Sequence, residues 1–202
     1  MERHGKNHSA LRVQRAKSTL VNIAGFQYKE DAEIYYTLLK ERLRKFNLEL
    51  EESKSRLIEF GRYAETNSKR KYGKKPETFD FLGFTFYCGK GKRSRNFCVK
   101  LKTNRKKFQQ KLKATKEWLY ENRTMPVKEM ISKLNLKLIG HYKYYGVSHN
   151  SAKIGAFLHF VQRYLYKVLN RRSHKRSYTW DGYIEMLKVY PLAKPRIYVK
   201  LF

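Results

Sequence analysis

The stretch PVKEMISKLNLKLIGHYKYY, residues 126–145, decides the fold. Its apolar side chains recur every three or four positions, from Val127 through Leu134 to Tyr142, which is the spacing of one face of an α-helix. Pro126 suits the first helical position because it has no amide hydrogen to leave unpaired. We therefore predict a helix over 126–145 that buries one face and exposes its lysines on the other.

Two more amphipathic helices flank this one. Over 104–120 an apolar stripe includes Phe108 and Leu112, and Thr103 is the predicted N-cap. Over 152–169 a second stripe begins at Ile154, with Ser151 as the predicted cap. Three amphipathic helices joined by short links predict a bundle over 103–172.

The residues on either side of the bundle show shorter patterns. We expect a helix over 28–46 and short strands over 18–26 and 56–60. An aromatic strand over 79–87, a turn over 89–92 and a strand over 95–101 predict a β-hairpin. A short helix around 183–188 then precedes an extended end that contains Pro191 and Pro195.

The predicted fold class is α+β. It consists of a small β/α unit with a β-hairpin, followed by a basic three-helix bundle. Residues 1–17 show no periodicity, and we expect them to be disordered.

The charge of the chain points to an anionic partner. Its 202 residues include 46 Lys and Arg against 17 Asp and Glu, which gives a formal net charge of +29. A protein this basic repels itself unless an anion neutralises it, and nucleic acid is the usual anion. Since 41% of the residues are hydrophobic, the chain also has enough apolar surface to build a core.

Targeting signals and cysteine chemistry are not apparent in the sequence. No run approaches the 18 or so apolar residues of a membrane span. The start, from Met1 to Lys6, leads into no apolar segment, so we expect no secretory signal and a cytoplasmic location. Cys88 and Cys98 are too few for a four-cysteine zinc site or a disulfide framework.

No self-sufficient catalytic site is visible. A two-metal polymerase or nuclease needs converging carboxylates, whereas Asp31, Asp80 and Asp181 fall in three different predicted elements. The six histidines show no metal-ligand spacing. We therefore predict no catalytic residue and no metal ligand in this chain.

Cations interleaved with tyrosines favour nucleic-acid binding. Cations neutralise phosphates, and exposed aromatic rings stack on unpaired bases, but this pattern alone does not separate RNA from DNA. At least half of the tyrosines should be core residues, whereas Tyr144 is a candidate for exposed stacking. The predicted binding residues are Lys102, Arg105, Lys106, Lys107, Lys111, Tyr144, Arg163, Lys167, Arg171, Arg172, Lys175, Arg176, Lys194 and Arg196.

Several blocks taken together resemble the C-terminal half of bacterial group II intron reverse transcriptases, the intron-encoded maturases. The stretches GFQYKEDAE (25–33) and ESKSRLIEFG (52–61) are similar to the palm that follows the polymerase's catalytic strand. FDFLGFTF (79–86) is similar to the family's FxFLGF hairpin near the primer terminus. IGHYKYYG (139–146) resembles the maturase-specific motif, in which Trp is common where His141 stands. The residues that carry these motifs are Lys54, Phe81, Leu82, Gly83, Phe84, Gly140, Tyr144, Tyr145 and Trp180.

The resemblance implies a division of the chain into a truncated reverse-transcriptase palm remnant with its hairpin over 18–102 and a thumb, or domain X, with the maturase-specific domain over 103–202. Residues 1–17 match nothing in the family and would be a disordered or aberrant N-terminus. The family's catalytic Tyr-Ala-Asp-Asp should lie just before Val21, where this chain has no aspartate. The fingers and the upstream palm are also missing.

By resemblance, then, the chain is an RNA-binding maturase-type remnant of an RNA-directed DNA polymerase, without polymerase activity of its own. It would bind structured group II intron RNA and assist its folding and splicing. Mg²⁺ would belong to the parent polymerase and to the intron RNA, and this chain would bind no cofactor.

Two other interpretations stay open at this point. The chain could be one half of a split reverse transcriptase that a fingers–palm polypeptide completes in trans, in which case an exposed sheet edge would be the docking surface. It could also be a decayed fragment without function. A generic DNA-binding protein is less well supported because nothing resembles a groove-reading helix.

Overall fold

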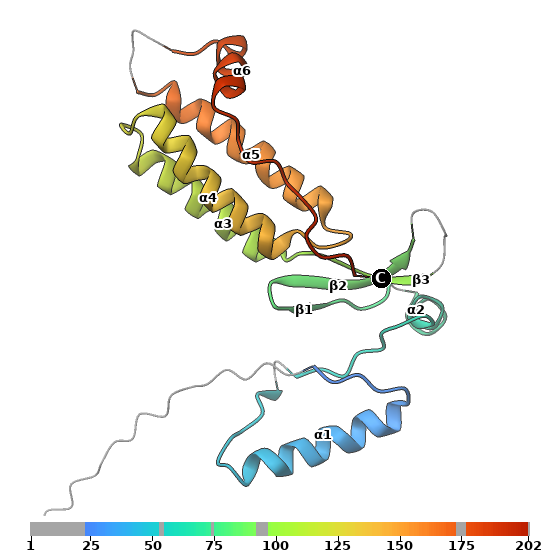
Figure 1. The fold of residues 1–202 in the computed structure, drawn as a ribbon. Helices are drawn as coiled ribbons and strands as arrows, with labels where there is room; N and C mark the ends of the chain where they lie inside the picture. The colour runs from blue at the N-terminus through green and yellow to red at the C-terminus, as the bar shows by residue number, and fades with distance from the viewer. Residues whose placement is uncertain (1–22, 53–54, 74, 92–96, 173–176, 202) are drawn as a thin grey trace, which may run out of the picture. The chain divides into compact units, whose positions relative to one another are not determined.

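The computed structural model describes residues 23–52, 55–73, 75–91, 97–172 and 177–201. The chain divides into two compact units, residues 1–57 and 58–202 (Figure 1). The predicted boundary between 102 and 103 falls inside the second unit, whose hairpin and bundle belong together. Residues 1–17, expected to be disordered, lie outside the described part of the chain. The assignment of palm and thumb to these segments remains a prediction.

The first unit contains one helix, α1 (Lys29–Arg44), which confirms the helix expected over 28–46. Glu30 and Asp31 occupy its first turn and Arg42 and Arg44 its last, an arrangement that complements the helix dipole. The strands expected over 18–26 and 56–60 are wrong wherever the structure describes them, at 23–26 and 56–60. Those apolar runs lie beside no described strand, and a lone strand leaves its backbone groups unpaired.

The second unit begins with helix α2 (Ala64–Tyr72) and a three-stranded antiparallel sheet in the order β1 (Phe79–Phe81), β2 (Phe84–Lys90) and β3 (Phe97–Thr103). The single strand predicted over 79–87 is wrong, because the chain reverses direction at Leu82 and Gly83. Their φ angles are 46° and 78°, and two successive positive values are typical of the tight type I′ hairpin turn. The aromatic alternation continues through this turn, so the sequence pattern does not reveal it.

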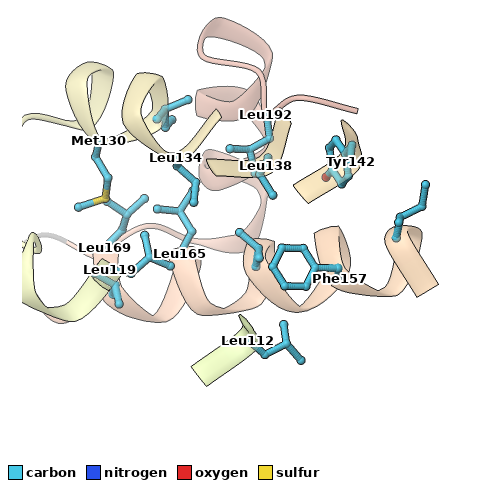
Figure 2. Packing of buried hydrophobic residues seen from close by; sticks show 14 of the residues in the cluster. Leu112, Leu119, Met130, Leu134, Leu138, Tyr142, Phe157, Leu165, Leu169 and Leu192 are labelled. Atoms are coloured by element: carbon cyan, nitrogen blue, oxygen red, sulfur yellow. The ribbon is translucent and has the colours of Figure 1, made fainter. Parts of the chain in front are cut away.

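Three helices follow the sheet and confirm the predicted bundle: α3 (Arg105–Glu121), α4 (Val127–Tyr145) and α5 (Ser151–Leu169). Their apolar stripes face one another around a common core, as Figure 2 shows for Leu134, Phe157 and Leu165. The last helix, α6 (Trp180–Val189), is longer than the expected 183–188 and adds Tyr183 to this core. The α+β class is therefore confirmed.

The caps differ from the prediction. Asn104, and not Thr103, caps α3, because its side-chain oxygen accepts hydrogen bonds from the amides of Lys106 and Lys107 at 2.9 and 3.2 Å. Ser151 lies inside α5, and the N-cap position is Asn150. Thr103 is instead buried, with 2% of its surface exposed.

Asn150 joins the sheet to the bundle. It is completely buried, and its Oδ1 accepts a hydrogen bond from the Thr103 amide at 2.8 Å. Its Nδ2 donates to Thr103 Oγ1 and to the Tyr145 carbonyl oxygen, both at 2.8 Å. A hydroxyl cap could not supply two donors and an acceptor at once, which explains an asparagine here.

The extended end confirmed over 191–198 is held on the bundle by α4 and the turn that follows it (Figure 1). The amide side chain of Asn135 donates to the Pro191 carbonyl oxygen at 3.0 Å and accepts from the Ala193 amide at 2.8 Å. Farther on, the Val199 amide donates to the Gly146 carbonyl oxygen at 3.1 Å. A Cβ at Gly146 would lie 2.3 Å from the Tyr142 carbonyl oxygen, so only glycine fits at this crossing.

One imidazole is buried in the bundle. His141 is 8% exposed, and its ring stacks on Phe157 with 3.8 Å between centroids. Burial, with a smaller contribution from the Lys111 ammonium, lowers the pKa of His141 from 6.5 to about 4. The folded protein therefore holds this histidine neutral where an unfolded chain would take up a proton.

We predict that Asn150→Ala lowers the free energy of unfolding by about 3 kcal/mol, because it leaves buried groups of Thr103 and Tyr145 without partners. Chemical denaturation measures the change. Asn122→Ala is the control, since the Asn122 side chain is only half-buried and donates one bond, to the Trp118 carbonyl oxygen. Equal losses of stability in the two variants would contradict the role given to Asn150.

We also predict a specific acid sensitivity. Because the folded-state pKa of His141 lies below the unfolded value, its contribution to stability is complete above pH 6.5 and is lost as the pH falls to about 4. The slope is at most about 1.4 kcal/mol per pH unit. Thermal unfolding across this range should fall more steeply for the wild type than for His141→Phe. The exposed His159→Phe should follow the wild type; parallel profiles for all three would contradict the prediction.

Candidate nucleic-acid interface

Cations and aromatic rings alternate where α3 and α5 lie side by side. The helices run in the same direction, because Phe108 meets Phe157 near their starts and Tyr120 meets Arg171 near their ends. This surface, called the α3–α5 seam below, consists of Phe108, Lys116, Tyr120, Lys153, Tyr164 and Arg171.

Each cation of the seam is held against an aromatic face. Lys116 Nζ is 5.9 Å from the ring centroids of both Tyr120 and Tyr164. Lys153 Nζ lies 5.4 Å from the Phe108 centroid, and Arg171 Nη1 donates to the Tyr120 hydroxyl at 2.9 Å. Such contacts orient the charged groups while leaving them in reach of solvent. The seam can therefore present ordered positive charge next to stacking surfaces.

The first turn of α3 concentrates further charge. Arg105, Lys106 and Lys107 are all exposed there, and this turn contains no acidic residue. The helix dipole places partial positive charge at the same end, so each cation costs about 0.3–1 kcal/mol in the free protein. An anion bound at this end would relieve the repulsion.

The structure separates the other predicted binding residues into several locations. Lys102, Arg163, Lys167, Lys194 and Arg196 are exposed, the first on β3, the next two on α5 and the last two on the extended end. The roles of these residues remain predictions.

Three arginines and lysines after α5 were predicted to act together with Arg171. Arg172 is half-buried, its Nη2 lies 3.5 Å from Met130 Sδ, and burial lowers the pKa of its guanidinium. It packs against the end of the core. Lys175 and Arg176 lie outside the described residues, as does the motif residue Lys54.

A groove of about 500 Å³ separates α3 from α4. Lys111 and Thr115 line it from α3, and Gly140, His141 and Tyr144 line it from α4. Lys111 thus belongs to this groove and not to the seam. Tyr144 is 53% exposed here, as expected for a stacking residue.

Two of the sequence motifs meet at the turn between β1 and β2. The Tyr144 hydroxyl donates to the Leu82 carbonyl oxygen at 2.8 Å. The Phe84 ring lies 5.9 Å from Tyr144 and 5.3 Å from Tyr145 between centroids. A Cβ at Gly83 would lie 3.0 Å from the Tyr145 hydroxyl oxygen. The hairpin turn and the end of α4 therefore hold each other in place.

The remaining motif residues lie elsewhere. Phe81 is half-buried in β1. Gly140 faces open space, because a Cβ there would meet no atom within 4 Å. Trp180 begins α6 and is half exposed, 5.1 Å from Tyr166 between ring centroids.

The sequence did not single out other basic residues that line hollows or the seam. A second groove, of about 600 Å³, lies between α2 and the β2–β3 hairpin and is lined by Arg62, Lys69, Arg70 and Lys90. Lys153 and Lys137 were missed as well. Spacing offers a partial signal, since Lys116 and Tyr120 stand one helical turn apart.

Metal-binding and membrane-spanning features are absent from the part of the chain that the structure describes. No three of its His, Cys, Asp or Glu side chains gather as metal ligands would. None of its helices is long and apolar enough to cross a membrane.

Comparison with known proteins gives one match. No curated protein and no solved structure is similar to the chain. Residues 105–183 match the model of the family described as "Group II intron, maturase-specific domain". The matched span begins at the first residue of α3, covers the whole bundle and ends within α6. The resemblance inferred from the sequence is therefore confirmed: the bundle belongs to the family of group II intron maturase-specific domains.

Proposed function

We propose that the chain is a non-catalytic RNA-binding protein that stabilises the folded form of a group II intron RNA and so assists its splicing. A protein that binds one conformation of a partner more tightly than the others shifts the equilibrium towards it by mass action. Splicing chemistry and its Mg²⁺ would belong to the RNA. The protein would contribute positive charge and stacking surfaces, and we expect it to act in the cytoplasm.

The observation that carries this proposal is the first turn of α3. Three exposed cations stand there against the helix dipole, with no acidic residue to offset them. This arrangement destabilises the free protein and becomes favourable once phosphates bind. The α3–α5 seam continues the same positive surface along the bundle, and its aromatic rings suit unpaired bases.

The direct test compares RNA binding with polymerase activity. We expect the chain to bind a group II intron RNA more tightly than a non-intron RNA of equal length, with an affinity that falls steeply with salt. Primer extension on an RNA template with Mg²⁺ should give no product. Equal affinity for the two RNAs would contradict the maturase proposal. Extension by the chain alone would show that it is a polymerase, and extension only with a fingers–palm polypeptide would favour the split enzyme.

The α3 cations can be tested separately. The triple variant Arg105→Gln, Lys106→Gln, Lys107→Gln should weaken intron RNA binding at least about tenfold. It should also reduce the salt slope by about 0.7–0.9 for each phosphate that the protein no longer neutralises. Because the cations oppose the helix dipole, the thermal midpoint should stay unchanged or rise.

The matched control removes the same charge from paired lysines. Lys29, Lys133 and Lys188 pair with Glu33, Glu129 and Glu185 respectively. Their triple replacement by Gln should change affinity much less. If both triple variants reduce affinity equally, binding depends on net charge and not on the α3 turn.

A further inference from the structure

We propose that the α3–α4 groove holds one unpaired nucleobase of the bound RNA, with His141 hydrogen-bonded to the edge of the base and Tyr144 stacked on its face. This inference rests on the proposed RNA-binding function and assigns a distinct role to a surface apart from the α3–α5 seam.

The groove has the size and lining that a flat aromatic ligand requires. Its volume of about 500 Å³ exceeds that of a single base. Leu134, Leu138 and Phe157 give it apolar walls, and such walls favour a ring that leaves water. At Gly140 the wall carries no side chain, and a Cβ there would meet only open space.

His141 supplies polar groups that the fold does not use. Its side chain lines the groove and is 8% exposed, and neither ring nitrogen has a hydrogen-bond partner among the described residues. Buried polar atoms without partners are rare in native proteins and call for an explanation. A neutral imidazole offers one donor and one acceptor, which is the pattern needed to pair with the edge of a base.

Tyr144 is fixed in advance as a stacking surface. Its hydroxyl is tied to the Leu82 carbonyl oxygen at 2.8 Å, and Phe84 lies nearly parallel to it, 10° between planes. Just over half of the residue nevertheless stays exposed beside the groove. A ring already held in place loses little conformational entropy when a base stacks on it.

Charge selects RNA as the occupant. Lys111 and Lys137 line the groove, and no Asp or Glu does. Lys137 Nζ lies 4.9 Å from the Trp118 ring centroid, which orients it. Two ammonium groups beside an apolar slot can neutralise the phosphates that flank an inserted base. An apolar peptide segment would gain nothing from these cations.

The experiment isolates a single base. It compares a short abasic RNA strand with the same strand that carries one central 2-aminopurine, whose fluorescence is quenched by stacking. The phosphates of the two strands are identical. The wild-type chain should bind the base-bearing strand about tenfold more tightly and quench its fluorescence.

Two variants test the groove itself. His141→Phe keeps the ring on Phe157 but removes both nitrogens, and Gly140→Met fills the groove. Each should reduce the preference for the base-bearing strand at least about threefold while leaving affinity for the abasic strand unchanged. Gly155→Met is the matched control, because Gly155 is also a helical glycine whose Cβ would meet no atom within 4 Å.

The outcomes separate this inference from the proposed function. If the chain binds group II intron RNA but binds the two strands equally, the groove does not take a base and the RNA-binding proposal stands. An unchanged preference in both groove variants would likewise overturn the inference and leave the groove to another occupant, such as a peptide. If intron RNA itself is not bound, the proposed function fails.

Discussion

The second unit depends on the three hydrogen bonds of Asn150. A completely buried amide must find partners, and Asn150 finds them at the end of β3 and at the end of α4. The chain satisfies them only when Thr103 and Tyr145 meet at one corner. The same corner brings the β1–β2 turn against Tyr144, so the stacking surface and the first turn of α3 are set by one joint.

Charge and stability oppose each other in this protein. With a net charge of +29, folding gathers cations that repel one another, and the apolar core of the bundle must offset that repulsion. The seam eases it by laying lysine and arginine heads over aromatic faces. The first turn of α3 does not ease it at all, and an unfavourable arrangement kept at such a place is typical of a functional site.

The sequence predicted the helices well because their apolar periodicity is long and survives in the core. It failed where one local choice reverses the chain: Leu82 and Gly83 form a turn within an unbroken aromatic pattern. It also failed for Asn150, since partners 47 residues away leave no local signal. The division of the α3 cations between seam and groove depends on how the helix is rotated against α4 and α5, and composition does not encode that rotation.

Amide hydrogen exchange of the native protein tests most directly whether the Asn150 joint makes sheet and bundle one cooperative unit. We expect the Thr103 amide to exchange as slowly as the core amides of Val161 and Leu165, and Asn150→Ala to accelerate its exchange. Fast exchange at Thr103 beside slow exchange in α5 would contradict the role of this joint, because the hairpin would then open independently of the bundle.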